Sequence, residues 1–175
     1  MADRRTVCWF SAGAASAVAT KLTLADNPSA VVAYCETGAE HPDNARFLRD
    51  CQAWFKRPIE RIRSDRFAST WDVFEKRRYL AGIEGAPCTM ELKVRPRLEW
   101  QEAADINVFG YTADRPDVER SKRLRSNNFE MAIRTPLIDR GLTKEACLAM
   151  IEHAGIALPP MYAMGFQGDW QWISS

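Results

Sequence analysis

The chain has 175 residues and a formal net charge of +1, since 24 lysines and arginines stand against 23 aspartates and glutamates. This length predicts a single domain over residues 1–175, and a hydrophobic content of 46% supplies a core and excludes a disordered chain. The small net charge provides no overall field that would favour nucleic acid or a membrane surface. No apolar run reaches the roughly 20 residues that cross a bilayer, and the first residues lead into a strand pattern rather than a signal peptide, so we expect a cytoplasmic protein.

Strand and helix patterns alternate along the first half of the chain. Apolar and β-branched runs predict strands, and apolar residues at helical spacing predict helices. In chain order these are a strand at 6–10, a helix at 14–25, a strand at 30–35, a helix at 43–55, a strand at 59–63 and a helix at 69–81. Pro42 suits the first turn of the second helix, and Ser69 or Thr70 is the expected cap of the third.

The second half continues the alternation after a less regular stretch. The segment 85–103 predicts a loop followed by a helix that starts or is interrupted at Pro96. Next come a strand at 106–111, a polar helix at 116–126, a strand at 129–137 and a helix at 143–155. Thr143 is its expected N-cap, and Gly155 lies past its end. Residues 156–175 have no periodicity and predict an irregular C-terminal tail.

This alternation predicts an α/β fold of three layers, with a mostly parallel five-stranded sheet and helices on both faces. Such sheets bind ligands at the carboxyl ends of their strands. The unusual loops all follow strands: "SAGAAS" the first, "ETGAEHPD" the second, "GYTADRPD" the fourth and "RTPLIDRG" the fifth. Four such loops at one edge of a sheet predict a binding site there.

The first loop joins a strand to a helix through the smallest side chains. Consecutive N–H groups of such a loop, with the positive end of the following helix, can bind phosphate. Ser11 and Ser16 could add hydroxyl donors, while the Walker pattern G-x-x-x-x-G-K-[ST] is absent. The alternative is a turn whose small residues let helix and strand pack closely.

Several motifs in order resemble the PP-loop ATP pyrophosphatases, and more closely their phosphoadenosine-phosphosulfate (PAPS) reductase-like branch. The resemblance covers about residues 6 to 166 and is nearest to small bacterial or phage-type members. The residues that carry it are the loop Ser11-Ala12-Gly13-Ala14-Ala15-Ser16, then Thr37, Gly38, Glu40 and Pro42, then Cys88, Thr89, Leu92, Lys93 and Pro96, then Gly110, Tyr111, Asp114 and Arg120, and finally the stretch 135–166 that begins "TPLIDRG".

The resemblance implies an adenine nucleotide alpha-hydrolase-like fold that binds ATP or a PAPS-type nucleotide. Phosphates would lie on Ser11 to Ser16, and adenine near the second strand end, at Glu36, Thr37 and Gly38. Tyr111 and Arg120 would also contact the nucleotide, with Arg123 completing a second anion clamp. Cys88 and Lys93 are the candidate catalytic residues, Lys93 as partner of a phosphate or sulfate or else a solvated helix lysine.

Mg²⁺ is a possible cofactor, held by Glu40 or Asp114, although no metal site is predicted with any definite set of ligands. His41 is either a proton carrier or a surface cap of the following helix. The acceptor of any transferred group and the oligomeric state are not predicted, and Trp170 and Trp172 are either an oligomer contact or a cover of the core. Nucleic acid is the weaker alternative acceptor, through the arginines between 57 and 78.

Three departures from the family pattern bear on catalysis. Ala15 stands where ATP-cleaving members often carry an acidic residue, and the chain end "GFQGDWQWISS" has neither a nucleophilic cysteine nor a C-x-x-C pair. We therefore expect no iron–sulfur cluster. The five cysteines form no C-x-x-C pair anywhere, and those at 8, 35, 51 and 147 lie in apolar patterns typical of packing thiols. Two functions remain: an enzyme that transfers an adenylyl or sulfur-containing group, and a catalytically impaired module that binds or senses a nucleotide or docks on another protein.

Overall fold

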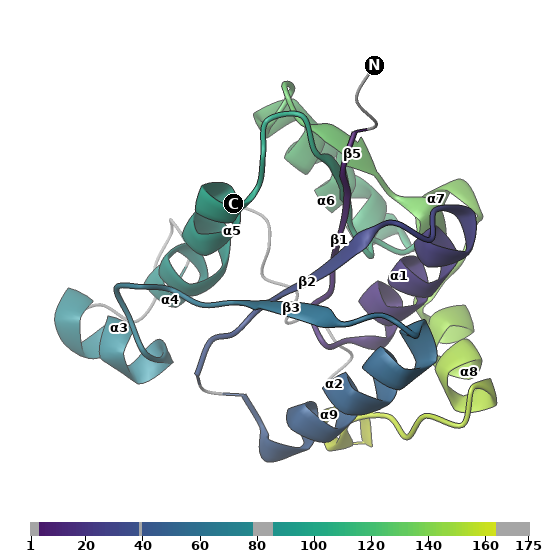
Figure 1. Ribbon diagram of the computed structural model, residues 1–175, viewed down its shortest axis with the longest axis horizontal. Coiled ribbons are helices and arrows are strands. Elements are labelled where there is room, and N and C mark those ends of the chain that lie inside the picture. The colour runs from purple at the N-terminus through teal and green to yellow at the C-terminus, as the bar shows by residue number, and fades with distance from the viewer. Residues whose placement is uncertain (1–3, 39, 79–85, 164–175) are drawn as a thin grey trace.

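The computed structural model describes residues 4–38, 40–78 and 86–163. Its centre is a five-stranded sheet in the order β3-β2-β1-β4-β5 (Figure 1). The strands are β1 (Thr6–Trp9), β2 (Val31–Cys35), β3 (Ile59–Ile62), β4 (Ile106–Val108) and β5 (Ala132–Arg134). Every neighbouring pair is parallel, which confirms the predicted fold class. The chain passes from β1 outward to β3 and then crosses back to β4, so the strand order reverses beside β1.

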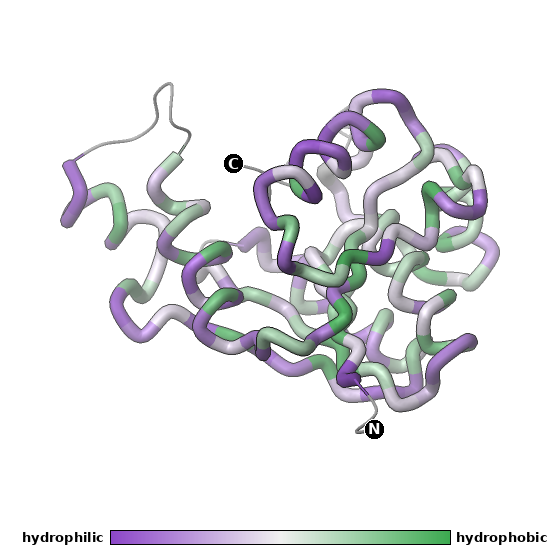
Figure 2. The backbone as a smooth tube through the Cα atoms, turned by 90° about the horizontal axis from the view of Figure 1, so that it is seen from above, coloured by the Kyte–Doolittle hydropathy of each residue, from purple (hydrophilic) through white to green (hydrophobic). Residues whose placement is uncertain are grey.

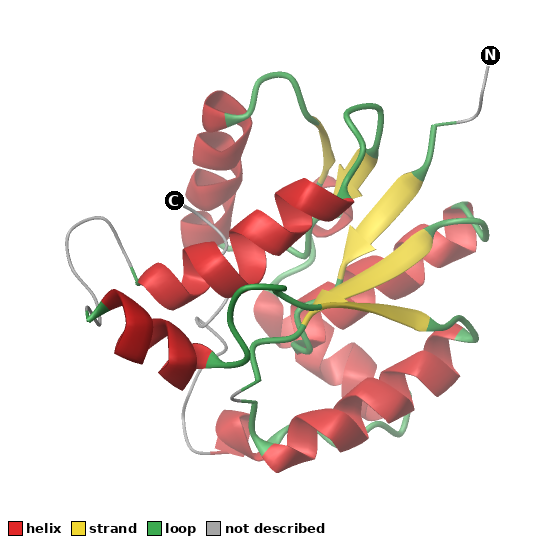
Figure 3. Ribbon diagram, turned by 60° about the vertical axis from the view of Figure 1, so that its left-hand side comes forward, coloured by secondary structure: helices red, strands yellow, loops and turns green. Residues whose placement is uncertain are grey.

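Helices cover both faces of the sheet, as the view in Figure 3 makes visible. Their bounds are α1 (Ala14–Asp26), α2 (Pro42–Phe55), α3 (Thr70–Arg77), α4 (Pro87–Thr89), the π-helical turn η1 (Met90–Val94), α5 (Arg95–Trp100), α6 (Arg115–Asn127), α7 (Pro136–Asp139), α8 (Lys144–His153) and α9 (Pro160–Ala163). None of the helices in the described ranges is both long enough and apolar enough to cross a membrane.

The core has two halves because successive side chains of a strand point to opposite faces. Cys8 and Phe10 of the β1 segment pack with buried residues of α1, α2 and α8. Val7 and Trp9 pack on the other face, with Phe109 after β4 and with residues of α5 and α6. In Figure 2 the hydrophobic residues run through the middle of the molecule, and hydrophilic residues gather on the outer turns of the helices.

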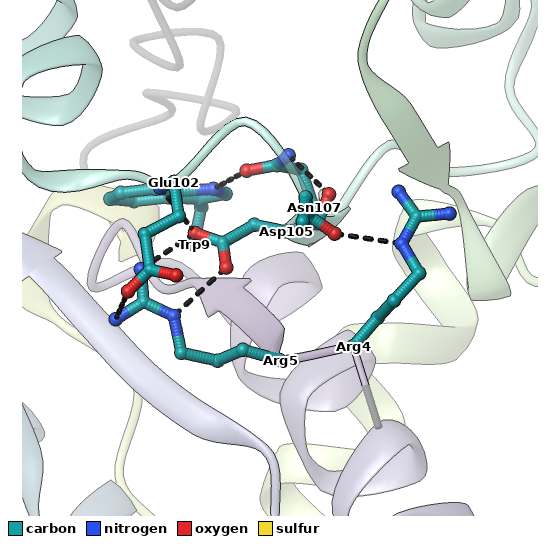
Figure 4. Close-up of polar contacts among 7 residues, drawn as sticks. Arg4, Arg5, Trp9, Glu102, Asp105 and Asn107 are labelled. Atoms are coloured by element: carbon teal, nitrogen blue, oxygen red, sulfur yellow. Dashed lines mark hydrogen bonds and ion pairs between the residues drawn. The ribbon is translucent and has the colours of Figure 1, made fainter. Parts of the chain in front are cut away.

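Polar side chains join β1 to β4 (Figure 4). Arg5 forms a bidentate pair with Asp105, at 2.9 Å from Nε to Oδ1 and 2.6 Å from Nη2 to Oδ2. On the same face of the sheet, the indole N–H of Trp9 donates to Asn107 at 2.8 Å. The Asp105 side chain is 1% exposed. The Arg5–Asp105 pair joins the amino ends of β1 and β4, at the edge opposite the loops predicted to bind ligand, and the Trp9–Asn107 bond adds a second link further along the strands.

The predicted caps are confirmed at three helices. Ser69 accepts from the N–H of Asp72, and Thr143 accepts from the N–H of Ala146. His41 caps α2 through its ring nitrogen Nδ1, which accepts from the N–H of Asp43 at 3.2 Å, as the capping alternative for this histidine predicted. Gly155 follows α8 with a φ of +73°, a conformation that favours glycine.

The predicted elements differ from the observed ones mainly after residue 85. A continuous helical segment runs from Pro87 to Trp100, so the helix does not start at Pro96 but begins before it, and the π-helical turn η1 interrupts its α-helical part just before this proline. A proline ring clashes with the carbonyl four residues earlier in an α-helix, and the wider π-helical turn before Pro96 displaces that carbonyl. The predicted strand 129–137 forms a strand only at Ala132–Arg134, because Pro136 begins α7. Within 156–175, α9 occupies four residues, while Trp170 and Trp172 lie outside the described residues.

Candidate functional site

The loop after β1 is ordered by one serine. The Ser16 hydroxyl accepts from the N–H of Ser11 at 3.1 Å, lies 3.0 Å from the Ser11 hydroxyl and donates to the carbonyl of Gly13 at 3.0 Å. Ala12 has a φ of +57°, and Gly13 is the extended N-cap of α1. Ser16 therefore fixes the turn that directs the chain from the sheet into the helix.

The backbone N–H groups at this turn are only partly used. Ala14 donates to the hydroxyl of Tyr162 at 2.9 Å, and Ala17 donates to the carbonyl of Gly13 at 3.0 Å. In the described ranges no acceptor meets the N–H groups of Ala12, Gly13 or Ala15, and these residues are half-buried. The positive end of a 13-residue helix lies at the same place. These groups can receive an anion.

Gly110 explains part of the small-residue pattern. A Cβ on this glycine would lie 2.5 Å from the Cα of Ser16, 2.7 Å from its backbone N and 3.0 Å from the carbonyl carbon of Ala15. The segment after β4 therefore packs directly on the first turn of α1. Close packing of helix and strand, the alternative explanation for the small residues, applies at Ala15 and Ser16. This contact leaves the small side chains of Ala12 and Gly13 unexplained.

The turn after β2 is held by Glu40. Its carboxylate accepts from the N–H of Thr37, from the Thr37 hydroxyl at 2.8 Å and from the Tyr34 hydroxyl at 3.2 Å. Burial raises the pKa of Glu40, but these hydrogen bonds outweigh it and hold the pKa below its usual range. Gly38 has a φ of +68°, and a Cβ there would lie 2.2 Å from the carbonyl oxygen of Ala68. Glu40 thus shapes the turn predicted to lie against adenine.

Glu36, also predicted to contact the nucleotide, forms ion pairs with two arginines from β3 and its end. Its carboxylate accepts from Arg61 at 2.7 Å and from Arg63. Burial raises the pKa of this carboxyl, and the two guanidinium groups lower it further than burial raises it. The Glu36 carboxylate therefore serves contacts within the sheet edge, and the Glu36 N–H donates to the carbonyl of Ile62 at 2.9 Å.

Asp114, the other predicted Mg²⁺ ligand, joins two helices. It accepts from the N–H of Lys144 at 2.8 Å and lies 2.9 Å from the Thr112 hydroxyl. Among the described residues, no group of three or more His, Cys, Asp or Glu side chains could hold a metal ion. Glu40 and Asp114 both serve internal hydrogen bonds, which does not fit either of them as a metal ligand.

A cationic pair lies beside the strand ends and includes a residue that the sequence analysis missed. Lys93 is half-buried, and burial lowers its pKa below the usual value. Arg97, four residues later, is only 4% exposed, and its Cζ lies 5.6 Å from the centre of the Phe109 ring. Among the residues that the structure describes, none accepts a hydrogen bond from its Nε or Nη1. No sequence signal singled out Arg97, because Lys93, Arg95 and Arg97 all lie between 92 and 97 and the sequence does not show which of them is buried.

The structure brings Tyr111 close to Arg97. Tyr111 is buried, and its pKa is raised to about 12 by burial, with the charge of Arg97 acting against the rise. The charges of Arg120 and Arg123 on α6 also act on Tyr111. Tyr111 and the three arginines therefore lie in one region. Arg120 itself pairs with Asp117 at 3.2 Å, and Arg123 is exposed.

The cysteines occupy the predicted environments. All five are free thiols, with Cys8, Cys51 and Cys147 buried, and Cys35 and Cys88 half-buried. Burial raises the pKa of Cys8, Cys51 and Cys147 to about 12 and that of Cys35 to about 11. Cys88 lies on the short helix α4, in the same helical segment as Lys93.

No family model and no curated protein matches the sequence. Among solved structures, the chain is similar to the phosphoadenylyl-sulfate (PAPS) reductase of Candida auris, determined as a phosphate complex. The match has a TM-score of 0.68 at 10% sequence identity and covers 94% of this chain and 79% of that one. The chain therefore has a PAPS reductase-like α/β fold, as the motifs predicted.

Proposed function

We propose that this chain binds an adenine nucleotide as a PAPS reductase-like protein, with residues 1–175 forming one nucleotide-binding domain. Phosphates bind to the loop 11–16, adenine lies beside Thr37 and Gly38, and Tyr111 and Arg120 complete the site. The observation that carries the proposal is the set of N–H groups at Ala12, Gly13 and Ala15, which no described residue accepts from. They lie at the carboxyl edge of a parallel sheet, beside the strand where its order reverses.

The cysteine thiols of this chain favour a function in nucleotide binding over the reduction of a sulfonucleotide by thiols. That chemistry needs a thiolate to attack sulfur and a second thiol to resolve the mixed disulfide. Burial keeps the thiols of the other four cysteines, at 8, 35, 51 and 147, protonated at neutral pH. Cys88 would act alone, with Lys93 as its neighbouring cation. Group transfer by Cys88 and Lys93 is the second candidate function, because both lie on one helical segment at the site.

The binding experiment uses a matched pair of variants at Ala12. Asn and Asp both tolerate its φ of +57°, and they differ by one charge at nearly the same shape. A ligand at 100 times its Kd stabilises the folded state by about 2.7 kcal/mol, which raises Tm by roughly 5–10 °C for a chain of this size. With ATP and Mg²⁺, or with PAPS, we expect this rise for the unmodified protein and for Ala12→Asn.

Ala12→Asp should lose the rise, because a carboxylate at the loop repels phosphate while favouring the helix end. A ligand-induced rise that is equal in both variants would place the nucleotide elsewhere. The same samples are assayed for pyrophosphate, for sulfite and for adenosine 3′,5′-bisphosphate in the presence of a thiol donor. A steady rate of product that Lys93→Met abolishes would favour group transfer, whereas binding without product favours the binding module.

A further inference from the structure

The carboxylate of Glu36 fixes two arginines that face solvent beside the candidate site. It pairs with Arg61 at 2.7 Å and with Arg63, and its side chain is 12% exposed while theirs are 50% and 73% exposed. One negative charge is shared by two positive charges, so the group keeps an excess of positive charge. Because a largely buried carboxylate orients both guanidinium groups, their remaining N–H donors are preorganised at the surface.

A second group of the same kind includes the helix α3. Glu91 of η1 is buried, and its carboxylate pairs with Arg77 of α3 and, at 3.6 Å, with Arg95 of α5. Arg77 is half exposed, and the neighbouring Arg78 is exposed and forms no ion pair with any described residue. In the segment 57–78, seven lysines and arginines stand against four aspartates and glutamates, although the whole chain has a net charge of only +1. The positive charge of the protein is therefore concentrated in this segment.

The helix α3 also presents a tryptophan to solvent. In Figure 1 this helix lies at the outer end of the molecule, next to α4, on which it packs. Val73 is buried, whereas Trp71 is 74% exposed and lies edge-on to Phe74, with the ring centres 6.1 Å apart. The guanidinium group of Arg77 lies 5.8 Å from the centre of the Phe67 ring. An exposed indole thus lies on the same short helix as an arginine that both a carboxylate and a ring hold in place.

The start of α3 packs on the turn proposed to hold adenine. A Cβ on Gly38 would lie 2.2 Å from the carbonyl oxygen of Ala68 and 3.1 Å from the Cα of Ser69, the N-cap of α3. Since β3 runs parallel to β2, the segment after it leaves the sheet at the same edge as that turn. A partner bound to α3 would therefore lie beside the candidate nucleotide site.

Fixed cations around an exposed aromatic ring are typical of surfaces that bind single-stranded nucleic acid. The cations contact phosphates, and bases stack on the ring. A stable protein interface buries roughly 800 Å² of each partner and has a core depleted in charged residues. Residues 75–78, at the end of α3, are all charged and exposed, which does not fit such a core. A duplex offers phosphates but covers the base faces that Trp71 would stack on.

We infer that α3 and the end of β3 bind single-stranded nucleic acid, with phosphates on the arginines and a base stacked on Trp71. The residues of this nucleic-acid surface are Arg61, Arg63, Trp71, Arg77 and Arg78. The inference goes beyond the proposed function, because it names a macromolecular partner that binds whether or not a nucleotide occupies the loop 11–16. It gives the arginines between 57 and 78 the role that the sequence suggested only as an alternative.

The test measures binding of a labelled oligothymidylate of about 12 nucleotides, within the usual site sizes, to the full chain by fluorescence anisotropy at several salt concentrations. The variants are Trp71→Ala, Trp71→Phe and the double change Arg63→Gln with Arg78→Gln. Arg63→Gln leaves Glu36 paired with Arg61, so no buried charge loses its partner. Circular dichroism and urea denaturation check that each variant is folded.

The matched controls lie at the opposite edge of the sheet. Phe129→Ala removes an aromatic ring that is 83% exposed just before β5. Arg140→Gln removes a partly exposed arginine that pairs with Asp26 at the end of α1. Both controls should bind the oligonucleotide like the unmodified protein.

Trp71→Ala should weaken binding by about five- to a hundredfold, the loss typical of one base stacked on an aromatic ring. Trp71→Phe keeps a ring and should bind with intermediate affinity. The double arginine variant should reduce the slope of log K against log salt concentration by about 1.4, since each phosphate contact on a single strand contributes about 0.7.

Equal binding by Trp71→Ala and Phe129→Ala would overturn the inference. A DNA duplex or a polyglutamate of equal charge that binds at least as tightly as the single strand would also overturn it, in favour of a duplex or an acidic protein. Ala12→Asp separates this surface from the proposed function, because it should bind the oligonucleotide like the unmodified protein while it loses the nucleotide-induced rise in Tm. If Ala12→Asp keeps that rise and oligonucleotide binding still needs Trp71, the nucleic-acid surface holds and the proposed loop site fails.

Discussion

The hydroxyl of Tyr162 accepts a hydrogen bond from the backbone N–H of Ala14 at 2.9 Å, across 148 positions of the chain. This contact brings α9 back to the first turn of α1, where the candidate phosphate loop ends. Burial raises the pKa of Tyr162, so the hydroxyl stays protonated and keeps a proton of its own to donate. A late segment of the chain thereby contacts the candidate site that follows its first strand.

Tyr162→Phe removes a partly buried hydrogen bond and should lower the free energy of unfolding by about 1 kcal/mol, the usual net contribution of one hydrogen bond. Urea denaturation, followed by tryptophan fluorescence and circular dichroism, measures the change. Trp71→Phe alters an aromatic residue that is 74% exposed and should stay within about 0.5 kcal/mol of the unmodified protein. Equal stability of all three proteins would show that the Tyr162 contact does not form in solution.

Gly110→Ala should separate the end of β4 from the first turn of α1. Its Cβ would lie 2.5 Å from the Cα of Ser16, and neither backbone can yield without moving the loop 11–16. We expect a loss of about 1–3 kcal/mol, as in overpacked cores, together with loss of the nucleotide-induced rise in Tm.

The control for that change is Gly155→Ala. Unlike Gly110, Gly155 has a positive φ of +73°, and nothing lies within 4 Å of its added Cβ. It should cost about 1 kcal/mol through backbone strain alone and leave nucleotide binding unchanged. If Gly110→Ala binds nucleotide as well as Gly155→Ala does, the packing of β4 on α1 does not set the shape of the loop.

Asp105→Asn should destabilise the protein at the amino ends of β1 and β4, the edge of the sheet opposite the candidate site. Burial raises the pKa of Asp105, but the hydrogen bonds from Arg5 and from the N–H of Glu102 hold it below its ordinary value of 3.8. A lowered pKa in the folded state gives stability that is present above pH 3.8 and is lost as the pH falls through the lowered value. The substitution should cost about 1–3 kcal/mol at pH 7, since Arg5 is partly exposed and the bond is charged.

The measurement for Asp105 is a series of urea denaturations between pH 7 and pH 2. The difference between the unmodified protein and Asp105→Asn should shrink as the acid range is entered. Arg4→Gln removes a neighbouring arginine that only donates to the carbonyl of Ala104, and it should leave the pH dependence intact. If the difference in free energy of unfolding between the two proteins stays constant with pH, the charge of Asp105 does not contribute to stability.

Local patterns predicted most of this fold. The alternation of apolar runs located all five strands, and capping residues such as Ser69 and Thr143 marked helix starts, because both signals depend only on neighbours in the chain. The shortness of β4 and β5 was not predictable, since strand length depends on how far the pairing partner extends. Pro96 favoured a helix start at that residue, but the helix continues through it because the π-helical turn η1 accommodates the proline ring.

The site was predictable in position and only partly in detail. The loops after the first, second and fourth strands meet at one edge, since the carboxyl ends of parallel strands must do so. The partners of individual carboxylates depend on distant contacts: Glu36 pairs with two arginines from β3 and its end, and Asp114 with the start of α8. Arg97 was missed because a charged residue in a helix is expected to face solvent, and only the fold shows that it is buried.

Glu40→Gln separates a structural role of Glu40 from the metal-binding role that the sequence suggested. Its Oε1 accepts from the N–H of Thr37, the hydroxyl of Thr37 and the hydroxyl of Tyr34. Gln keeps an acceptor at that position but loses the charge, so unfolding should become easier by about 1–2 kcal/mol. The turn around Gly38, which packs against the backbone of Ala68, should become less rigid.

The binding of ATP at several Mg²⁺ concentrations then decides between the roles. If Glu40 acts only through Thr37 and Tyr34, the ratio of ATP affinity with and without Mg²⁺ is the same in Glu40→Gln and in the unmodified protein. Asp50→Asn, at a half-buried carboxylate that pairs with Arg46 on α2, controls for loss of one negative charge. A Mg²⁺ dependence that disappears in Glu40→Gln and persists in Asp50→Asn would make Glu40 a metal ligand, which its three internal donors argue against.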